Sequence, residues 1–447
     1  MASKTPLLRA IAQRQYAAGQ AATKPFTAQA SGEVKTTVLP NKLVVSCVEN
    51  NSPVSRVSIL FRAGPRYETA DSLGASHVLR IAAGLGTKGA TQFAITRNLQ
   101  QTGANLSADV GREHIAYTLE ATKDTVEESL QYLVDVACKQ AFKPWELNDN
   151  LPRLRYELAG LSPQAKAVDL LHKVAYRTGL GNSLFCPDHR VGKVSSETMQ
   201  HFTNQLFRTN RAAVAGVGID QNILVPLAQN LGIESGAGPD SPKSSFHQGE
   251  VRQETSGPIA VVALATESAG LNNSKDALVF ALLQRLVGTG PHVKWSAAAA
   301  GSPLGKAVSS AVGSEYAAAS ALNVSYTDSG LFGVVLAAPA SVAGKAVESA
   351  VRTLRSLSVT DADVQRAKAQ LRADALLSVD SGAGLLESIG LESLMHGSVT
   401  PLTQLLSQIE GISTSDVSAV ARKIASGKPA MASVGNLSSV PYLDQLK

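Results

Sequence analysis

The side chains of this 447-residue sequence that could do chemistry are concentrated between residues 62 and 113. A predicted helix over residues 76–83 carries His77, whose imidazole can bind a metal ion or exchange a proton near neutral pH. The charged residues of the same stretch include Arg62, Arg66, Glu68, Arg80, Arg112 and Glu113. This stretch is therefore the first place to look for a metal site or an acid–base site.

The other histidines show no spacing that would let two of them bind one metal ion. They are His114, His172, His189, His201, His247, His292 and His396. We expect each to be an ordinary surface residue or a hydrogen-bonded core residue. The Gly-Thr-Gly run at 288–290 is not a phosphate-binding loop, because it follows a predicted helix and lacks the Lys-Ser or Lys-Thr pair of such loops.

Three cysteines, Cys47, Cys138 and Cys186, are too few and too widely spaced to form a disulfide framework. The sequence also has no C-x-x-C-H haem attachment motif, and three such cysteines cannot supply the ligand set of an iron–sulfur cluster. We therefore expect no cofactor in this chain.

Two stretches repeat the same hydrophobic pattern about 217 residues apart. Apolar residues occur at helical spacing at positions 126, 130, 133, 134 and 137, and again at 343, 347, 350, 351 and 354. A second pair of predicted helices, near 199–206 and 417–424, repeats in the same way. The period is too long for a solenoid, so the pattern predicts a duplicated domain of about 200 residues.

Strands and helices are mixed within each half without strict strand–helix–strand alternation, which predicts the α+β class. We expect two homologous α+β domains in tandem that face each other across a cleft. The first is assigned to residues 33–231 and the second to 258–447, joined by a linker at 232–257 that is rich in Gly, Ser, Pro and charge. Extra residues near 295–305 predict a longer loop in the second half.

Residues 1–32 contain the basic residues Lys4, Arg9, Arg14 and Lys24 and no acidic residue. This composition predicts a mitochondrial transit peptide, with a disordered basic tail as the alternative. Without this segment the formal net charge falls from +5 to +1 (5 − 4), which gives no electrostatic case for a nucleic-acid partner. No apolar run approaches the ~20 residues that span a bilayer, so membrane association is expected through partners or a surface.

The stretch that opens the first half resembles the pitrilysin/insulinase-type metallopeptidases, a family that includes the mitochondrial processing peptidases. The resemblance is carried by RAGPRYET at 62–69, GASHVLRI at 74–81, GTKG at 86–89, GAN at 103–105 and Arg112-Glu113. It covers nearly the whole chain. It implies a fold of duplicated α+β halves, which agrees with the repeat found from the hydrophobic pattern alone.

In that family the first of these helices carries H-x-x-E-H, in which two histidines bind Zn²⁺ and the glutamate acts as the base. Here His77 is followed by Arg80 where the base should stand and by Ile81 where the second ligand should stand. Arginine cannot accept a proton, and isoleucine has no lone pair. The motif is therefore degenerate, and we expect no metal, no catalytic residue and no peptidase activity.

The remaining ligands of the implied zinc site are not secure either. The third ligand, a downstream glutamate, would fall near Glu157 or Arg155, and the sequence leaves the register open. The equivalent helix of the second half, at 276–283, contains neither His nor Glu. The second half therefore offers no replacement site.

Three further stretches, at 182–194, 288–294 and 325–333, are similar to the core-protein branch of this family. Its members are subunits of mitochondrial ubiquinol–cytochrome c reductase, respiratory complex III. The resemblance implies a non-catalytic structural subunit on the matrix side of the inner membrane, peripheral to it. The implied partners are core protein 1 and the cytochrome b, cytochrome c1 and Rieske subunits of the complex III dimer. The cleft between the halves could hold a peptide, such as a retained presequence, without cutting it.

Two other functions are weighed against this one. A non-catalytic subunit of the matrix processing peptidase would carry a long glycine-rich loop in its second half, but residues 288–305 are rich in alanine instead. An active metallopeptidase is opposed directly by Arg80 and Ile81. A role in processing through a partner core protein 1 stays open.

Overall fold

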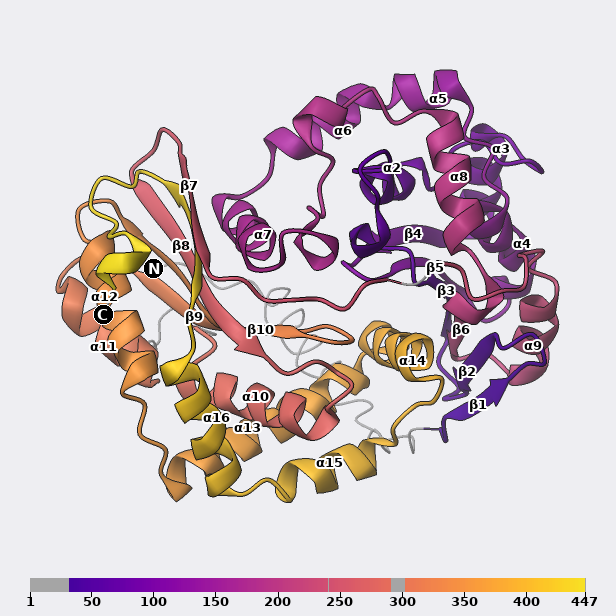
Figure 1. The fold of residues 1–447 in the computed structure, drawn as a ribbon. Coiled ribbons are helices and arrows are strands. Elements are labelled where there is room, and N and C mark those ends of the chain that lie inside the picture. Colours follow the sequence, from indigo (N-terminus) through magenta and orange to yellow (C-terminus); the bar gives the residue numbers. More distant parts are fainter. Residues whose placement is uncertain (1–31, 240, 291–301, 447) are drawn as a thin grey trace, which may run out of the picture.

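The computed structural model describes residues 32–239, 241–290 and 302–446 (Figure 1). Residues 1–31 of the predicted transit peptide at 1–32 and most of the predicted loop at 295–305 lie outside the described residues. In the part of the chain that is described, no helix is long and apolar enough to cross a membrane.

The first half is built on a six-stranded sheet with the order β1-β2-β6-β3-β5-β4. The strands are β1 (Lys35–Val38), β2 (Val44–Val48), β3 (Val54–Phe61), β4 (Asn105–Val110), β5 (Ile115–Thr122) and β6 (Ala212–Val217). Strands β2 and β6 are parallel, and the other neighbours are antiparallel. The helices of this half are α2 (Ala75–Ala82), α3 (Gln92–Gln101), α4 (Val126–Cys138), α5 (Pro144–Asp149), α6 (Leu151–Ala159), α7 (Pro163–Tyr176), α8 (Ser196–Leu206) and α9 (Gln221–Gln229).

The second half is built on a five-stranded sheet with the order β7-β11-β8-β10-β9. Its strands are β7 (Gly249–Glu254), β8 (Ile259–Ser268), β9 (Ala318–Ser325), β10 (Gly330–Pro339) and β11 (Ala430–Gly435). Its helices are α10 (Ser274–Val287), α11 (Pro303–Val312), α12 (Ala343–Arg355), α13 (Asp361–Asp380), α14 (Gly382–His396), α15 (Leu402–Glu410) and α16 (Thr414–Ser426). Two α+β halves in tandem are therefore present, as the sequence predicts.

Strand β7 differs from the expectation of an exposed linker at 232–257. It lies inside that stretch and pairs in parallel with β11 at the edge of the second sheet. Its residues are half-buried or exposed, because only one of its sides has a neighbouring strand. Its polar composition, GEVRQE, explains why the sequence does not distinguish it from a loop.

Each sheet is covered on its second face by a helix from the other half (Figure 1). Helix α7 of the first half packs its buried Ala167, Leu171 and Ala175 against β8 and β11 of the second sheet. Helix α14 of the second half packs Leu386 and Ile389 against β2, β3 and β6 of the first sheet.

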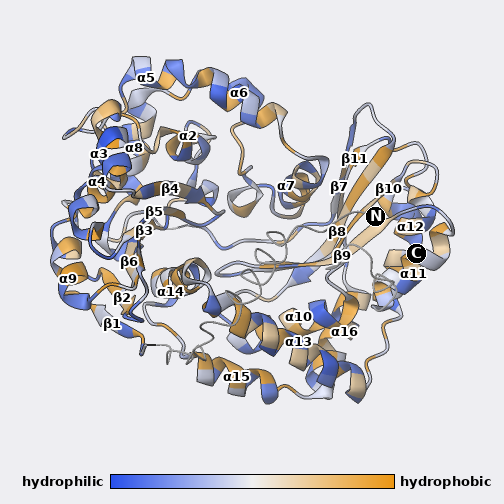
Figure 2. Cartoon of the chain, turned by 180° about the vertical axis from the view of Figure 1, so that it is seen from behind, coloured by the Kyte–Doolittle hydropathy of each residue, from blue (hydrophilic) through white to orange (hydrophobic). Residues whose placement is uncertain are grey.

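This exchange explains why the central strands are hydrophobic on both faces. Strands β6 and β11 are buried along their whole length. The hydrophobic colour of β8 and β10 in Figure 2 follows from the same double cover. Helix α14 comes close to its sheet at Gly390, where an added Cβ would lie 3.0 Å from a Leu60 methyl.

A buried ion cluster fastens the two halves together. The Arg66 guanidinium donates to Glu113 at 2.5 Å and to both Asp328 oxygens at 2.8 and 2.7 Å. The side chains of Arg66 and Glu113 are only 6% and 5% exposed. Glu113 also accepts from the Thr327 N–H at 3.0 Å, and Asp328 accepts from the Ser244 N–H at 2.8 Å. Every member of the cluster thus binds a group from the other half or from the connecting segment.

Further hydrogen bonds join the two halves, and together with the ion cluster they form the seam between them. The Tyr326 hydroxyl donates to His172 Nε2 at 2.7 Å, because His172 Nδ1–H is used by the Val168 carbonyl at 2.7 Å. Arg62 donates to the carbonyl oxygens of Leu394 and Met395 at the end of α14. The seam therefore ties both exchanged helices to the opposite half.

Replacing Arg66 with methionine should lower the free energy of unfolding of the full chain by about 3–5 kcal/mol, because it leaves two buried carboxylates without their cation. Chemical denaturation followed by circular dichroism measures this. The matched control is Arg372→Met, whose pair with Glu410 spans 3.5 Å and is about half exposed (54% and 53%). It should cost less than about 1 kcal/mol. Equal losses in the two variants would contradict the role of the cluster.

Candidate functional site

The start of α2 places His77 and is held by a buried carboxylate. Glu68 accepts hydrogen bonds from the Gly74 N–H at 2.9 Å, the Ser76 N–H at 2.8 Å and the Ser76 hydroxyl at 2.6 Å. Gly74 has a φ of 86°, a left-handed conformation that favours glycine at this entry to the helix. Burial raises the pKa of Glu68 to about 7, although these hydrogen bonds oppose the rise. The first turn of α2 is therefore fixed in place.

Both ring nitrogens of His77 are occupied. The Cys186 N–H donates to His77 Nδ1 at 3.0 Å, so the proton of the neutral ring lies on Nε2 and is donated to Glu157 at 3.2 Å. Burial lowers the pKa of His77, and the Glu157 contact only partly offsets this. The neutral imidazole is thus a hydrogen-bond donor toward the position where a metal ion would need its lone pair.

Glu157 on α6 is the residue that meets His77, which settles the register that the sequence leaves open. Its carboxylate is shared by His77, by an ion pair with Arg80 and by Arg153 Nε at 3.2 Å. Burial alone would raise the pKa of Glu157, but the hydrogen bonds from Arg80 and His77 lower it overall. Arg155, the other candidate, is exposed.

Ile81 lies in a small apolar cluster with Leu154 and Cys186 and is only 4% exposed. The position of the second metal ligand is therefore packed with hydrocarbon. Arg80 places a permanent cation on the carboxylate that would serve as the third ligand. Among the described residues, no group of three or more His, Cys, Asp or Glu side chains could hold a metal ion. These residues do not fit a zinc ion.

Comparison with known proteins assigns the fold and this site to a family. A family model described as Insulinase (Peptidase family M16) matches residues 43–188, and one described as Peptidase M16 inactive domain matches residues 193–371. The human "Cytochrome b-c1 complex subunit 2, mitochondrial" is 37% identical over 420 residues, covering 93% of this chain and 92% of that protein. The chain belongs to the M16 peptidase family, in the branch of cytochrome b-c1 complex subunit 2.

One further relative and one solved structure are also similar to this chain. The "Probable mitochondrial-processing peptidase subunit alpha-1, mitochondrial" of Arabidopsis thaliana is 28% identical, over 93% of this chain and 84% of that protein. A chain of the solved structure "Complex III2 from Candida albicans, Inz-5 bound" has a TM-score of 0.79, with 20% identity over 92% of this chain and 98% of that chain. This second match supports the duplicated M16 fold.

A chamber of about 610 Å³ lies between the first sheet and α14 in this M16 fold. Its lining is acidic: Asp109, Glu120 and Glu387 stand against Arg56, which pairs with Glu120 at 2.6 Å. Burial lowers the pKa of His114, so this ring adds little positive charge. The chamber also borders β4, the edge strand of its sheet. Chemically, such a chamber suits an extended peptide with basic side chains.

The thiols of this M16 chain are protonated and poorly nucleophilic at neutral pH. Burial raises the pKa of Cys138 to about 12 and that of Cys186 to about 11. It also raises the pKa of Cys47. Since the thiolate is the reactive form, none of the three suits nucleophilic catalysis.

Sequence reasoning finds part of this region and misses part. It identifies His77, Arg80 and Ile81, and the structure brings the first two together on Glu157. It leaves Glu157 as one of two choices, and it misses the cap formed by Glu68. No local signal marks Glu68, because a carboxylate that caps a helix from several residues upstream lies outside the usual capping motif.

Two buried neutral histidines predict sensitivity to acid. Burial lowers the pKa of His77 and, together with Arg112, holds that of His172 well below its ordinary value. The unfolded chain therefore binds protons first as the pH falls below about 6.5. The stabilising contribution of each ring is complete above that pH and is lost as the pH falls toward the folded-state pKa. Glu68 acts in the opposite direction, so a single histidine must be isolated by substitution.

The variant His172→Gln should show a slope of unfolding free energy against pH that is smaller than wild type by up to about 1.4 kcal/mol per pH unit below pH 6.5. Urea denaturation at several pH values between 5 and 8 measures the slope. The exposed His201 on α8 supplies the control, His201→Gln, which should leave the slope unchanged. An unchanged slope in the His172 variant would contradict the argument.

Proposed function

We propose that this chain is a non-catalytic structural subunit of mitochondrial ubiquinol–cytochrome c reductase, complex III, and that it supports assembly and stability of the complex. The observation that carries the proposal is the 37% identity to human cytochrome b-c1 complex subunit 2 over nearly the full length of both proteins. The occupied Glu157 carboxylate supports the non-catalytic part, because Arg80 neutralises it and His77 donates to it.

The proposal includes a location and partners. The chain would be peripheral to the inner membrane on its matrix side, attached through core protein 1 and the cytochrome b, cytochrome c1 and Rieske subunits of the complex III dimer. Redox chemistry would belong to those subunits. The chain would contribute a large folded body and no cofactor, catalytic residue or metal ligand.

We also propose a division of the chain into functional parts. Residues 1–32 would target the protein to mitochondria, and residues 33–231 would form the first domain with the degenerate motif at His77, Arg80 and Ile81. The segment 232–257 would connect this domain to the second, at 258–447. Its last residues would belong to the second sheet, since β7 (Gly249–Glu254) pairs with β11.

The second candidate is the non-catalytic subunit of the matrix processing peptidase. The 28% identity to the Arabidopsis protein supports a shared family, but it is lower than the 37% identity to the human b-c1 subunit over the same share of the chain. The stretch 291–301, which holds most of the alanine-rich sequence, lies outside the described residues. Sequence similarity therefore favours the respiratory complex.

A native gel of a mild-detergent mitochondrial extract, stained for haem and blotted for this chain, tests the proposed function. The chain should migrate at high mass together with haem, in the membrane fraction. Migration in the soluble fraction at the mass of a two-subunit peptidase, without haem, would contradict the proposal and favour the second candidate. A blot for a matrix enzyme outside this complex serves as the fractionation control.

Metal removal should leave the purified full chain unchanged. After dialysis against EDTA its melting temperature should equal that before dialysis, because the ion pair between Arg80 and Glu157, and not a metal, holds the site together. Elemental analysis should find less than about one-tenth of a zinc ion per chain. Stoichiometric zinc with a lower melting temperature after EDTA would contradict the degenerate site.

The double variant Arg80→Glu, Ile81→His restores the H-x-x-E-H sequence that begins at His77. It should still cleave no presequence peptide. The new histidine would enter the apolar cluster with Leu154 and Cys186, whereas a metal-binding histidine is normally oriented by a hydrogen bond to its other ring nitrogen. Cleavage is followed by mass spectrometry of the peptide, with wild type as the control. Cleavage by the double variant alone, without a partner chain, would overturn this expectation.

A further inference from the structure

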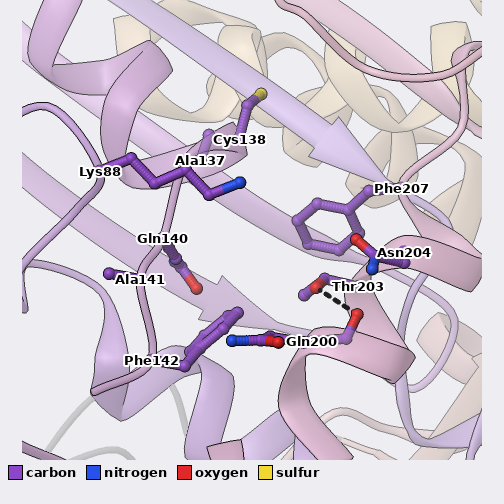
Figure 3. Close-up of a pocket in the computed structure, with 10 residues that line it drawn as sticks. All are labelled: Lys88, Ala137, Cys138, Gln140, Ala141, Phe142, Gln200, Thr203, Asn204 and Phe207. Atoms are coloured by element: carbon purple, nitrogen blue, oxygen red, sulfur yellow. Dashed lines mark hydrogen bonds between the residues drawn. The ribbon is translucent and has the colours of Figure 1, made fainter. Parts of the chain in front are cut away.

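A second pocket lies on the outer side of the first half, built by other elements than the degenerate metal site. It has a volume of about 220 Å³ and lies between helix α8 and the segment that follows α4 (Figure 3). Its apolar walls are Phe142 and Phe207, which are 4% and 8% exposed. An apolar cavity of about 150 Å³ accepts benzene, so this pocket has room for an aromatic ring with a short polar tail.

The pocket is preformed, because its walls are fixed by contacts that need no ligand. The Lys88 N–H donates to the Lys139 carbonyl at 2.8 Å, and Thr87 and Gln140 form an antiparallel bridge. Phe207 stacks on Phe61 of β3 with ring centroids 3.9 Å apart. Phe142 has a φ of 48°, an uncommon conformation for a bulky residue, which its buried ring helps to hold.

The polar groups of the pocket leave an acceptor unused. Gln140 donates its amide N–H groups to the Val136 carbonyl at 2.6 Å and to the Tyr117 hydroxyl at 3.2 Å, which fixes the orientation of the amide. Its Oε1 is buried and has no hydrogen-bond partner among the described residues. Figure 3 shows this oxygen pointing inward, toward the Phe142 ring. A buried acceptor of this kind calls for a donor.

The charge of the pocket is positive. Lys88 reaches over the pocket with its ammonium group, and Gln200 and Asn204 on α8 add amide donors at the rim (Figure 3). Among the described residues that line the pocket, none is acidic, and Lys88 forms no ion pair with any described residue. The rim is thus suited to an anionic group that hydrogen-bonds to amides.

We propose that this pocket binds a small aromatic 2-hydroxy carboxylic acid. The carboxylate would pair with Lys88 and the rim amides, the hydroxyl would donate to Gln140 Oε1, and the ring would pack between Phe142 and Phe207. A bound acid would join the segment after α4 to α8. This site is independent of the proposed function, because none of its residues belongs to the seam or to the degenerate motif.

Isothermal titration of the full chain with 3-phenyllactate tests the proposal. Saturable binding is expected, weakened about threefold to tenfold in the variant Lys88→Met by loss of a charge-assisted hydrogen bond. Lys88 is exposed, so this variant keeps the fold. The matched control is Lys345→Met, an exposed lysine of α12 in the other half, which should bind as wild type does.

Two analogues test the remaining contacts. The compound 3-phenylpropane-1,2-diol lacks the carboxylate and 3-phenylpropanoate lacks the hydroxyl, and both should bind more weakly than 3-phenyllactate. The proposal is overturned if 3-phenyllactate gives no saturable heat, if Lys88→Met and Lys345→Met bind it equally, or if either analogue binds as tightly as the hydroxy acid.

Discussion

The ion cluster of Arg66, Glu113 and Asp328 is the interaction on which the arrangement of the two halves depends. A guanidinium and two carboxylates with side chains 5–14% exposed are costly to bury, and only their mutual hydrogen bonds offset that cost. Although burial raises the pKa of Asp328, the hydrogen bonds from Arg66 and the Ser244 N–H hold it below its ordinary value. The cluster therefore forms only when the second half and the connecting segment are in place. It stabilises the correct arrangement of the two halves and no other.

The exchange of helices α7 and α14 couples the two halves that this cluster joins. Each sheet needs an apolar helix on its second face, and that helix comes from the other half. Separation of the halves would expose both sheets at once, so folding of one half is coupled to folding of the other. In the same way, Arg80 replaces a metal by an ion pair at Glu157 and keeps α2 joined to α6. Both features hold a site together without catalytic chemistry, which suits a structural subunit.

Hydrophobic periodicity in the sequence predicts which face of a helix is buried. It does not predict which sheet that face packs against. The repeated positions 126–137 and 343–354 are the buried faces of α4 and α12, and the α+β class with duplicated halves is confirmed. The linker assignment at 232–257 is wrong where β7 forms, because a polar edge strand has the composition of a loop. The exchange of α7 and α14 could not be predicted, since an apolar helix face does not specify which sheet covers it. The register at Glu157 depends on how α6 packs beside α2, which is a tertiary property.

The most direct test of this account compares two variants in cells whose own copy of the chain is replaced. Glu157→Gln removes the carboxylate at the degenerate site, and Arg66→Met removes the cation of the seam. Per amount of folded chain, Glu157→Gln should leave the level of assembled complex III and its ubiquinol–cytochrome c reductase rate unchanged, because the ion pair that it removes lies within the first half. Arg66→Met should lower both together, because its ion pair with Asp328 joins the two halves. Loss of assembly or of reductase rate in Glu157→Gln at a normal level of the chain, with Arg66→Met unaffected, would contradict the claim that this chain acts through its architecture.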